Sequence, residues 1–265
     1  MSDTPMGSWR NPPLAYVVAE LQISPFYQLG NHVAEFQGAI RERFPRTEEA
    51  NVVRLQIQGN APMAQTEKVW RFFSENRRLG VNLSSRAISL HATEYEDFPA
   101  FSQTIKLVVS AAERAIPGLF VEQLGLRYID YLLPKEGEST WDYVAESLRG
   151  VTPAGSTRAT EAYWIANYEF AQGSVSLRVI PVLPKGQVFP PNFGPIAVAP
   201  AETQSEAMRR DAKGEPVGCI DTDRLMPMGK KLSSQDVVDA LSAMHTDVFD
   251  TFRATMSKKA EEAWI

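Results

Sequence analysis

The chain has 265 residues, of which 44% are hydrophobic and 22% charged, a balance that supports a folded core and excludes global disorder. Its formal net charge of -5 argues against general nucleic-acid binding, which depends on clustered Lys and Arg. The single cysteine, Cys219, excludes an internal disulfide and any cysteine-cluster metal site. Residues 1–10 lack a secretory signal and no stretch is apolar enough for a membrane span, so we expect a cytoplasmic protein without membrane contact.

The first half of the chain predicts a sheet with two helices. Pro12 and Pro13 form a stiff, extended entry to a strand. Apolar residues then recur at three- and four-residue spacing up to Phe44, which is typical of one helical stripe, and Pro45 ends it. Short connections within 68–92 favour antiparallel neighbours. The predicted strands are 14–23, 51–58, 69–73, 80–83, 87–91 and 119–133, and the predicted helices are 31–44, with Asn31 as its cap, and 98–116.

The second half has a more irregular pattern. Residues 161–170 and 174–183 predict a hairpin joined around Gly173, and six prolines between 181 and 200 predict an irregular connection. A capping pattern from Ser233 to Asp236 opens the longest apolar stripe of the chain. The other predicted elements are a short helix at 141–148, a helical piece at 206–210, a strand at 217–223 and a helix at 234–260.

Together these elements predict the α+β class, with an antiparallel or mixed sheet and three main helices at 31–44, 98–116 and 234–260. We expect two lobes. The first, residues 1–134, reads strand, helix, strands, helix, strand. The second, residues 135–265, holds the hairpin, the proline-rich connection, a strand and the long C-terminal helix.

The common catalytic motifs do not occur in this sequence. It has no glycine-rich phosphate loop, no His-Glu-x-x-His and no Gly-x-Ser-x-Gly. We therefore predict no catalytic residue and no cofactor, and a protein that is not an enzyme is favoured.

Two polar groups are candidate sites. Asp221 and Asp223 at the end of a predicted strand, with His245 on the next helix, could hold Mg²⁺ or Mn²⁺ for phosphoester chemistry; turn and cap hydrogen bonds are the favoured explanation of the two aspartates. Arg127 lies in an apolar strand, where it either forms a buried ion pair with Asp130, Glu20 or Asp221 or binds an anion in a groove.

Several segments together carry a resemblance. The opening Asn11-Pro-Pro-Leu14, the central Leu124-Gly-Leu-Arg-Tyr-Ile-Asp130 and the closing Leu241-x-x-x-His245-x-x-x-Phe249 are similar to the patterns of a sporadically distributed family of uncharacterised bacterial proteins of similar length. The resemblance spans most of the chain and is loose between Gly150 and Pro216. It implies a bacterial, cytoplasmic accessory protein, of the kind found on mobile elements or in defence loci, and supplies no activity or catalytic residues.

Two functions follow as expectations. The first is a non-catalytic accessory protein that acts through protein–protein interaction, with a protein partner or as a homodimer, as a defence, immunity or antitoxin-like component. The alternative is a nucleic-acid-binding or metal-dependent nucleic-acid-processing protein, which would use Arg127 for phosphate and a divalent metal at Asp221, Asp223 and His245.

Overall fold

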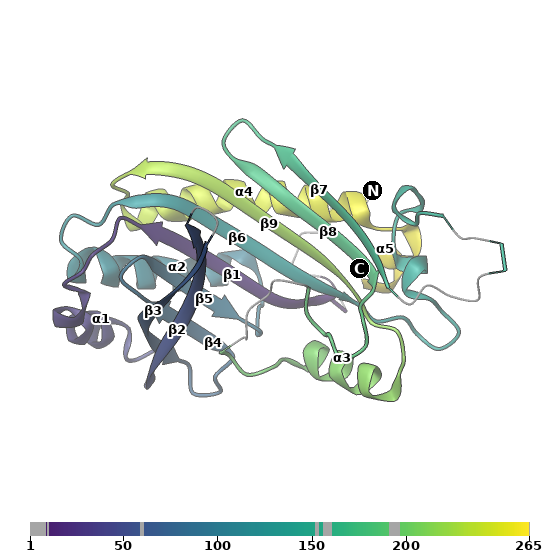
Figure 1. Cartoon of the computed structure of the whole chain (residues 1–265), viewed down its shortest axis with the longest axis horizontal. Helices are drawn as coiled ribbons and strands as arrows, with labels where there is room; N and C mark the ends of the chain where they lie inside the picture. The colour runs from purple at the N-terminus through teal and green to yellow at the C-terminus, as the bar shows by residue number, and fades with distance from the viewer. Residues whose placement is uncertain are drawn as a thin grey trace.

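The computed structural model describes residues 9, 11–58, 61–151, 154–155, 161–190 and 197–264. Nine strands in this part form one antiparallel sheet in the order β2-β3-β4-β5-β1-β6-β9-β8-β7 (Figure 1). They are β1 (Leu14–Ile23), β2 (Arg46–Gln58), β3 (Ala61–Phe73), β4 (Leu79–Leu83), β5 (Ala87–Ala92), β6 (Val121–Leu132), β7 (Ala162–Glu169), β8 (Ser174–Val182) and β9 (Gly218–Lys230). The predicted α+β class with an antiparallel sheet is confirmed.

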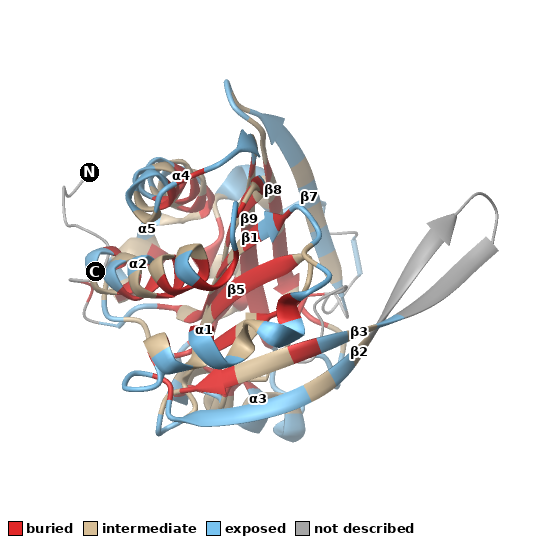
Figure 2. Cartoon of the chain, turned by 90° about the vertical axis from the view of Figure 1, so that its left-hand side faces the viewer, coloured by how far each residue is buried: buried red, intermediate tan, exposed pale blue. Residues whose placement is uncertain are grey.

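Five α-helices accompany the sheet in the described part: α1 (Val33–Ile40), α2 (Phe98–Ala115), α3 (Glu202–Lys213), α4 (Ser234–Thr255) and α5 (Lys258–Trp264). The long helices α2 and α4 pack against each other and cover one face of the sheet (Figure 2). None of the described helices has the length and apolar character needed to cross a bilayer.

The main hydrophobic core lies between the sheet and this helix layer. Val17, Ala19 and Leu21 alternate along β1 and point into it, because successive side chains of a strand face opposite sides. The apolar stripe of α2 packs on them, and this helix begins where the Asp97 side chain accepts a hydrogen bond from the Ala100 amide at 2.8 Å. The apolar stripe of the helix and the alternate apolar residues of the strand therefore pack together in one core.

The opposite face of the sheet is covered differently. The helix α3 packs over one end of it, where Ala207 joins a smaller core with Tyr131, Ile180 and Cys219. Figure 1 views this face, with α2 and α4 behind the sheet. Toward the other end, the central strands present polar side chains, and we call this surface the open face.

The two predicted lobes are not confirmed, because one sheet contains strands from both. The strand β6 of the first predicted lobe pairs with β9 of the second, from Gln123 opposite Pro227 to Leu132 opposite Gly218. The boundary at 134/135 falls in the chain that leaves β6, and this chain returns to the same sheet as β7.

Several predicted elements differ in extent from the observed ones. The predicted helix 31–44 is a 3₁₀ turn (Leu29–Asn31) followed by α1, which starts after His32 and shows no side-chain cap. The predicted helix 234–260 is interrupted at Met256, whose extended backbone bridges to Val144, and it resumes as α5. The predicted piece 206–210 is the longer α3, and 141–148 forms two 3₁₀ turns. Pro191 and Pro195 of the proline-rich connection lie outside the described residues.

Candidate functional site

Arg127 lies on the open face of the sheet. Its neighbours in β6, Leu126 and Tyr128, belong to the helix-covered core, so alternation turns Arg127 to the other side. It is paired across the ladder with Asp223 of β9, and Asp221 lies two residues earlier on the same face. The structure therefore brings together three of the four residues that the sequence singles out.

Asp221 is the centre of a buried ion network. Its side chain is 0% exposed, and it accepts hydrogen bonds from Arg127 Nε and Nη2, both at 2.7 Å, and from Arg178 Nη1 at 2.9 Å. A carboxylate removed from water needs this degree of compensation, and two guanidinium groups provide it. Of the partners considered for Arg127, the structure selects Asp221.

The network shifts the pKa values of its members. Burial raises the pKa of Asp223, although the positive charge of Arg127 acts in the opposite direction. Burial by itself would lower the pKa of Arg127, but the hydrogen bonds and charge of Asp221 more than offset this and raise it. The bidentate bond to Asp221 also occupies the guanidinium edge that would bind an anion. This arrangement fits a structural role, in which the charged side chains neutralise one another inside the sheet.

His245 lies on the other side of the sheet from the two aspartates. Its ring stacks on Phe98 with a centroid distance of 4.3 Å and contacts Tyr128, both in the helix-covered core. Burial lowers the pKa of His245 to about 4, so the imidazole is neutral at physiological pH. The predicted metal set of Asp221, Asp223 and His245 is not assembled, because the sheet separates its members. Across the described residues, no group of three or more His, Cys, Asp or Glu side chains is arranged to hold a metal ion.

A second polar cluster on the open face surrounds His91 of β5. The Tyr16 hydroxyl contacts His91 Nδ1, and Asn82 Nδ2 and Ser89 Oγ lie 2.8 and 2.6 Å from Nε2. Burial, with a smaller effect from the charge of Arg71, lowers the pKa of His91 to about 4. Sequence reasoning treats His91 as isolated, yet Asn82, Ser89 and His91 alternate with apolar residues in neighbouring predicted strands, and that pattern indicates a shared face.

The thiol of Cys219 lies on the same side of the sheet as Asp221, in the smaller core under α3. This side chain is buried, and burial followed by the charge of Asp221 raises its pKa well above the ordinary value. A protonated, enclosed thiol is a poor nucleophile. The polar groups of this face are thus engaged with one another rather than poised for reaction.

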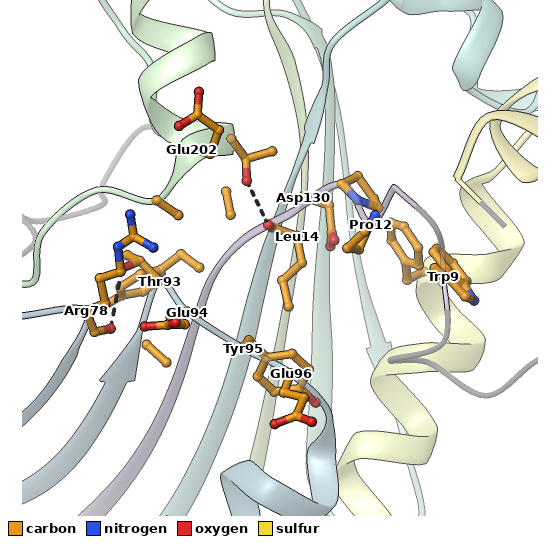
Figure 3. Close-up of a pocket in the computed structure, with 17 residues that line it drawn as sticks. Trp9, Pro12, Leu14, Arg78, Thr93, Glu94, Tyr95, Glu96, Asp130 and Glu202 are labelled. Carbon is orange, nitrogen blue, oxygen red and sulfur yellow. Dashed lines mark hydrogen bonds between the residues drawn. The ribbon is translucent and has the colours of Figure 1, made fainter. Parts of the chain in front are cut away.

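A cavity of about 280 Å³ opens at the end of the sheet where β1 begins (Figure 3). Its walls include Pro12 and Leu14 before and within β1, Tyr95 before α2, and Phe252 of α4. Asp130 of β6 also lines it, and this carboxyl is 6% exposed. Sequence reasoning considers Asp130 only as a partner of Arg127. The sequence feature that could have indicated a separate role is an aspartate flanked by apolar residues within a core strand.

Three residues of the adjacent basic pairs Arg77-Arg78, Arg209-Arg210 and Lys230-Lys231 form ion pairs within the described part of the chain. Arg77 pairs with Glu48 at 2.7 Å, and Arg209 and Arg210 both pair with Glu206 one turn earlier on α3, at 2.9 and 2.8 Å. Cations paired in this way contribute little to a phosphate-binding surface.

Comparison with known proteins gives no relative for this chain, since neither a protein-family model nor a curated protein matches it. The resemblance to an uncharacterised bacterial family stays a prediction.

Proposed function

We propose that this chain is a non-catalytic accessory protein of the bacterial cytoplasm, of the defence, immunity or antitoxin type, which acts by binding another protein. The observation that supports this proposal is the outer edge of β7, the last strand of the sheet. Within the described residues, no strand pairs with this edge. An unpaired edge presents backbone donors and acceptors to an extended segment of a partner.

Alternate residues of β7 direct their backbone groups away from β8. The Phe170 amide donates to the Gly173 carbonyl at 2.9 Å, and the antiparallel register continues from this pair along both strands. Because hydrogen-bonded pairs alternate with non-bonded pairs, the amides and carbonyls of Ile165, Asn167 and Glu169 point outward. The edge can therefore accept one more strand.

The same strand carries exposed apolar side chains. Tyr163, Ile165 and Tyr168 are 41, 59 and 42% exposed, and they make up half of the large hydrophobic side chains exposed among the described residues. Edge strands are commonly protected by Lys or Pro, and β7 contains neither. Gathered apolar side chains at an unprotected edge are typical of a contact surface.

The charges around β7 indicate the chemistry of the partner. Glu161 immediately precedes the strand and Glu169 ends it, and both are exposed. We infer an extended partner segment that is apolar in its middle and basic at its ends. Two copies of residues 161–169 paired antiparallel about Ile165 would place Glu161 opposite Glu169, so the homodimer expectation is not favoured at this edge.

The nucleic-acid alternative has no comparable support. The predicted metal ligands lie on opposite sides of the sheet, and Arg77, Arg209 and Arg210 each form an ion pair with a glutamate.

A peptide-display experiment tests the edge directly. A random dodecapeptide library is selected on the wild-type protein and counter-selected on Ile165→Pro, with Ile165→Val as the matched control. Proline is tolerated on an edge strand where the amide faces solvent, and it removes one outward donor. We expect the enriched peptides to be apolar with basic flanks, and to bind the wild type and the valine variant but not the proline variant.

Hydrogen exchange identifies where these peptides bind. On binding, the amides of Ile165, Asn167 and Glu169 should exchange more slowly, while thermal unfolding shows that both variants are folded. Peptides that bind Ile165→Pro equally well, or that protect another surface, would contradict the proposal. So would a selection without enrichment.

A further inference from the structure

The cavity at the start of β1 contains a buried carboxyl that has no partner among the described residues. Asp130 is 6% exposed, and it forms no hydrogen bond or ion pair with the described residues. The carboxyl group nonetheless borders the cavity, where Figure 3 shows it beside Leu14 and Pro12. A buried carboxyl normally has a partner, so an open position next to this one is suited to a ligand.

The surroundings of Asp130 favour a cation. The cavity walls also carry the carboxylates of Glu94, Glu96 and Glu202, and among the described residues Arg78 is the one cationic side chain that lines it. Arg78 lies at the opposite end of the cavity from Asp130 (Figure 3). Glu202 pairs with Arg209, and Glu94 accepts a hydrogen bond from Asn76. Among the charges of the described residues, the one that acts on the Asp130 carboxyl is the negative charge of Asp221.

Aromatic side chains complete this end of the cavity. Trp9, Tyr95 and Phe252 line it together with Pro12 and Pro13. Aromatic faces attract ammonium groups and bury the carbon chain that carries them. A volume of about 280 Å³ lies just below the roughly 300–1,000 Å³ of sites for drug-sized ligands, so the ligand is small.

We propose that this cavity binds a small organic amine, whose ammonium group pairs with the Asp130 carboxylate and whose carbon chain packs on Tyr95 and Trp9. The proposal is independent of the binding edge on β7, because the two surfaces share no residue. The cavity is thereby given a ligand class, although no sequence motif predicts a site there.

The proposal predicts that Asp130 releases a proton when an amine binds, and this release can be measured. Burial, followed by the negative charge of Asp221, raises the pKa of Asp130 to about 8, so the free site is mainly a carboxylic acid at neutral pH. An ammonium ligand binds the carboxylate, and the displaced proton leaves to solvent. The other titratable groups near Asp130 are Tyr95, Tyr128 and Cys219, and burial keeps each protonated by raising its pKa. The affinity should therefore rise about tenfold per pH unit up to pH 8.

Calorimetry with 2-phenylethylamine, cadaverine and choline tests the proposal, with neutral 2-phenylethanol as the matched uncharged probe. We expect at least one amine to bind, 2-phenylethanol to bind at least tenfold more weakly than 2-phenylethylamine, and one proton to be released per amine, measured in two buffers of different ionisation enthalpy.

The variants separate the site from the fold. Asp130→Asn keeps the shape of the side chain and should lose both amine binding and proton release while it remains folded. Glu122→Gln, the same type of change at an exposed position of the same strand, should leave both unchanged. The proposal is overturned if no amine binds at millimolar concentration, if Asp130→Asn binds as well as the wild type, or if 2-phenylethanol matches the amine.

Discussion

The ion network around Asp221 provides a quantitative test of the reasoning about the open face. Asp221→Asn removes the charge at constant size, and Arg127 and Arg178, whose side chains are 17 and 26% exposed, lose the carboxylate that bonds both of them. Breaking one partner of a buried pair costs about 3–5 kcal/mol. Both guanidinium groups keep some contact with water, so we expect the lower end, a loss of about 3 kcal/mol in the free energy of unfolding.

A double-mutant cycle separates this interaction from general damage to the fold. Asp221→Asn and Arg127→Met are measured singly and together by urea unfolding, followed by tryptophan fluorescence. With a slope of about 3 kcal/mol per molar urea, the loss for Asp221→Asn moves the midpoint by about 1 M. The double variant should be more stable than the sum of the single losses predicts, by about 1–3 kcal/mol, because each single variant breaks the same bond between Arg127 and Asp221 and leaves its remaining member with less compensation.

The control for this cycle is an exposed ion pair. Glu48→Gln removes the partner of Arg77, and the unfolding midpoint should not move, since exposed pairs contribute little. Strict additivity of Asp221→Asn and Arg127→Met, or a loss for Asp221→Asn as small as that for Glu48→Gln, would refute the conclusion that Asp221 holds the two arginines together.

Three further changes have worked outcomes. Gly173→Ala should lower the free energy of unfolding by at least about 3 kcal/mol, because φ is +86° and the added Cβ would lie 2.0 Å from the Leu225 carbonyl oxygen. Gly186→Ala is the control: with φ of +82° and no atom within 4 Å of the added Cβ, it should cost only about 1–2 kcal/mol, as measured by thermal unfolding. Asp130→Asn should stabilise the protein relative to the wild type increasingly as pH rises from about 4 to 8, by up to about 6 kcal/mol. The reason is that the pKa of Asp130 is about 8 in the folded protein and near 3.8 in the unfolded chain. A difference in urea unfolding that does not depend on pH would contradict this. His245→Phe should reduce the loss of stability as pH falls from about 6.5 to 4 by up to about 3 kcal/mol, because folding lowers the pKa of His245 to about 4. An unchanged pH profile would show that folding does not lower the pKa of His245.

Local periodicity predicts much of this fold. The strand 14–23 and the hairpin around Gly173 are observed nearly as predicted, and the capping pattern at Ser233 opens α4 with the Ser233 side chain accepting from the Asp236 amide. These features depend on neighbours within a few residues, so the sequence contains their full cause.

Long-range pairing explains what periodicity does not predict. A lone arginine in the apolar strand β6 predicts a buried partner, but Asp130, Glu20 and Asp221 are equivalent until the strand order is known. Arg127 and Asp221 are separated by 94 positions in the chain and meet only because β9 lies beside β6. The register between such distant strands has no local signature.

The position of His245 depends on docking in the same way. It flanks the apolar stripe of α4, and the stripe predicts that the helix packs on a sheet without specifying the face. The structure places α4 over the face that carries Leu126 and Tyr128, so His245 meets Phe98 rather than Asp221. A metal site drawn from residue types alone fails at this step.

The cavity at Asp130 arises from the ends of elements rather than from any single strand. Alternation along β6 turns Asp130 toward the helix layer, as it does Tyr128, and predicts burial for both. The layer stops short of this end of the sheet, since α2 begins only at Phe98 and Phe252 is near the end of α4, and both Tyr95 and Phe252 line the resulting gap. One more helical turn would have enclosed the carboxyl completely and required a partner for it. A fold that instead keeps beside an open cavity an acid with no partner in the described part of the chain gives up stability at that position, and buried polar groups without partners are concentrated at sites that bind ligands.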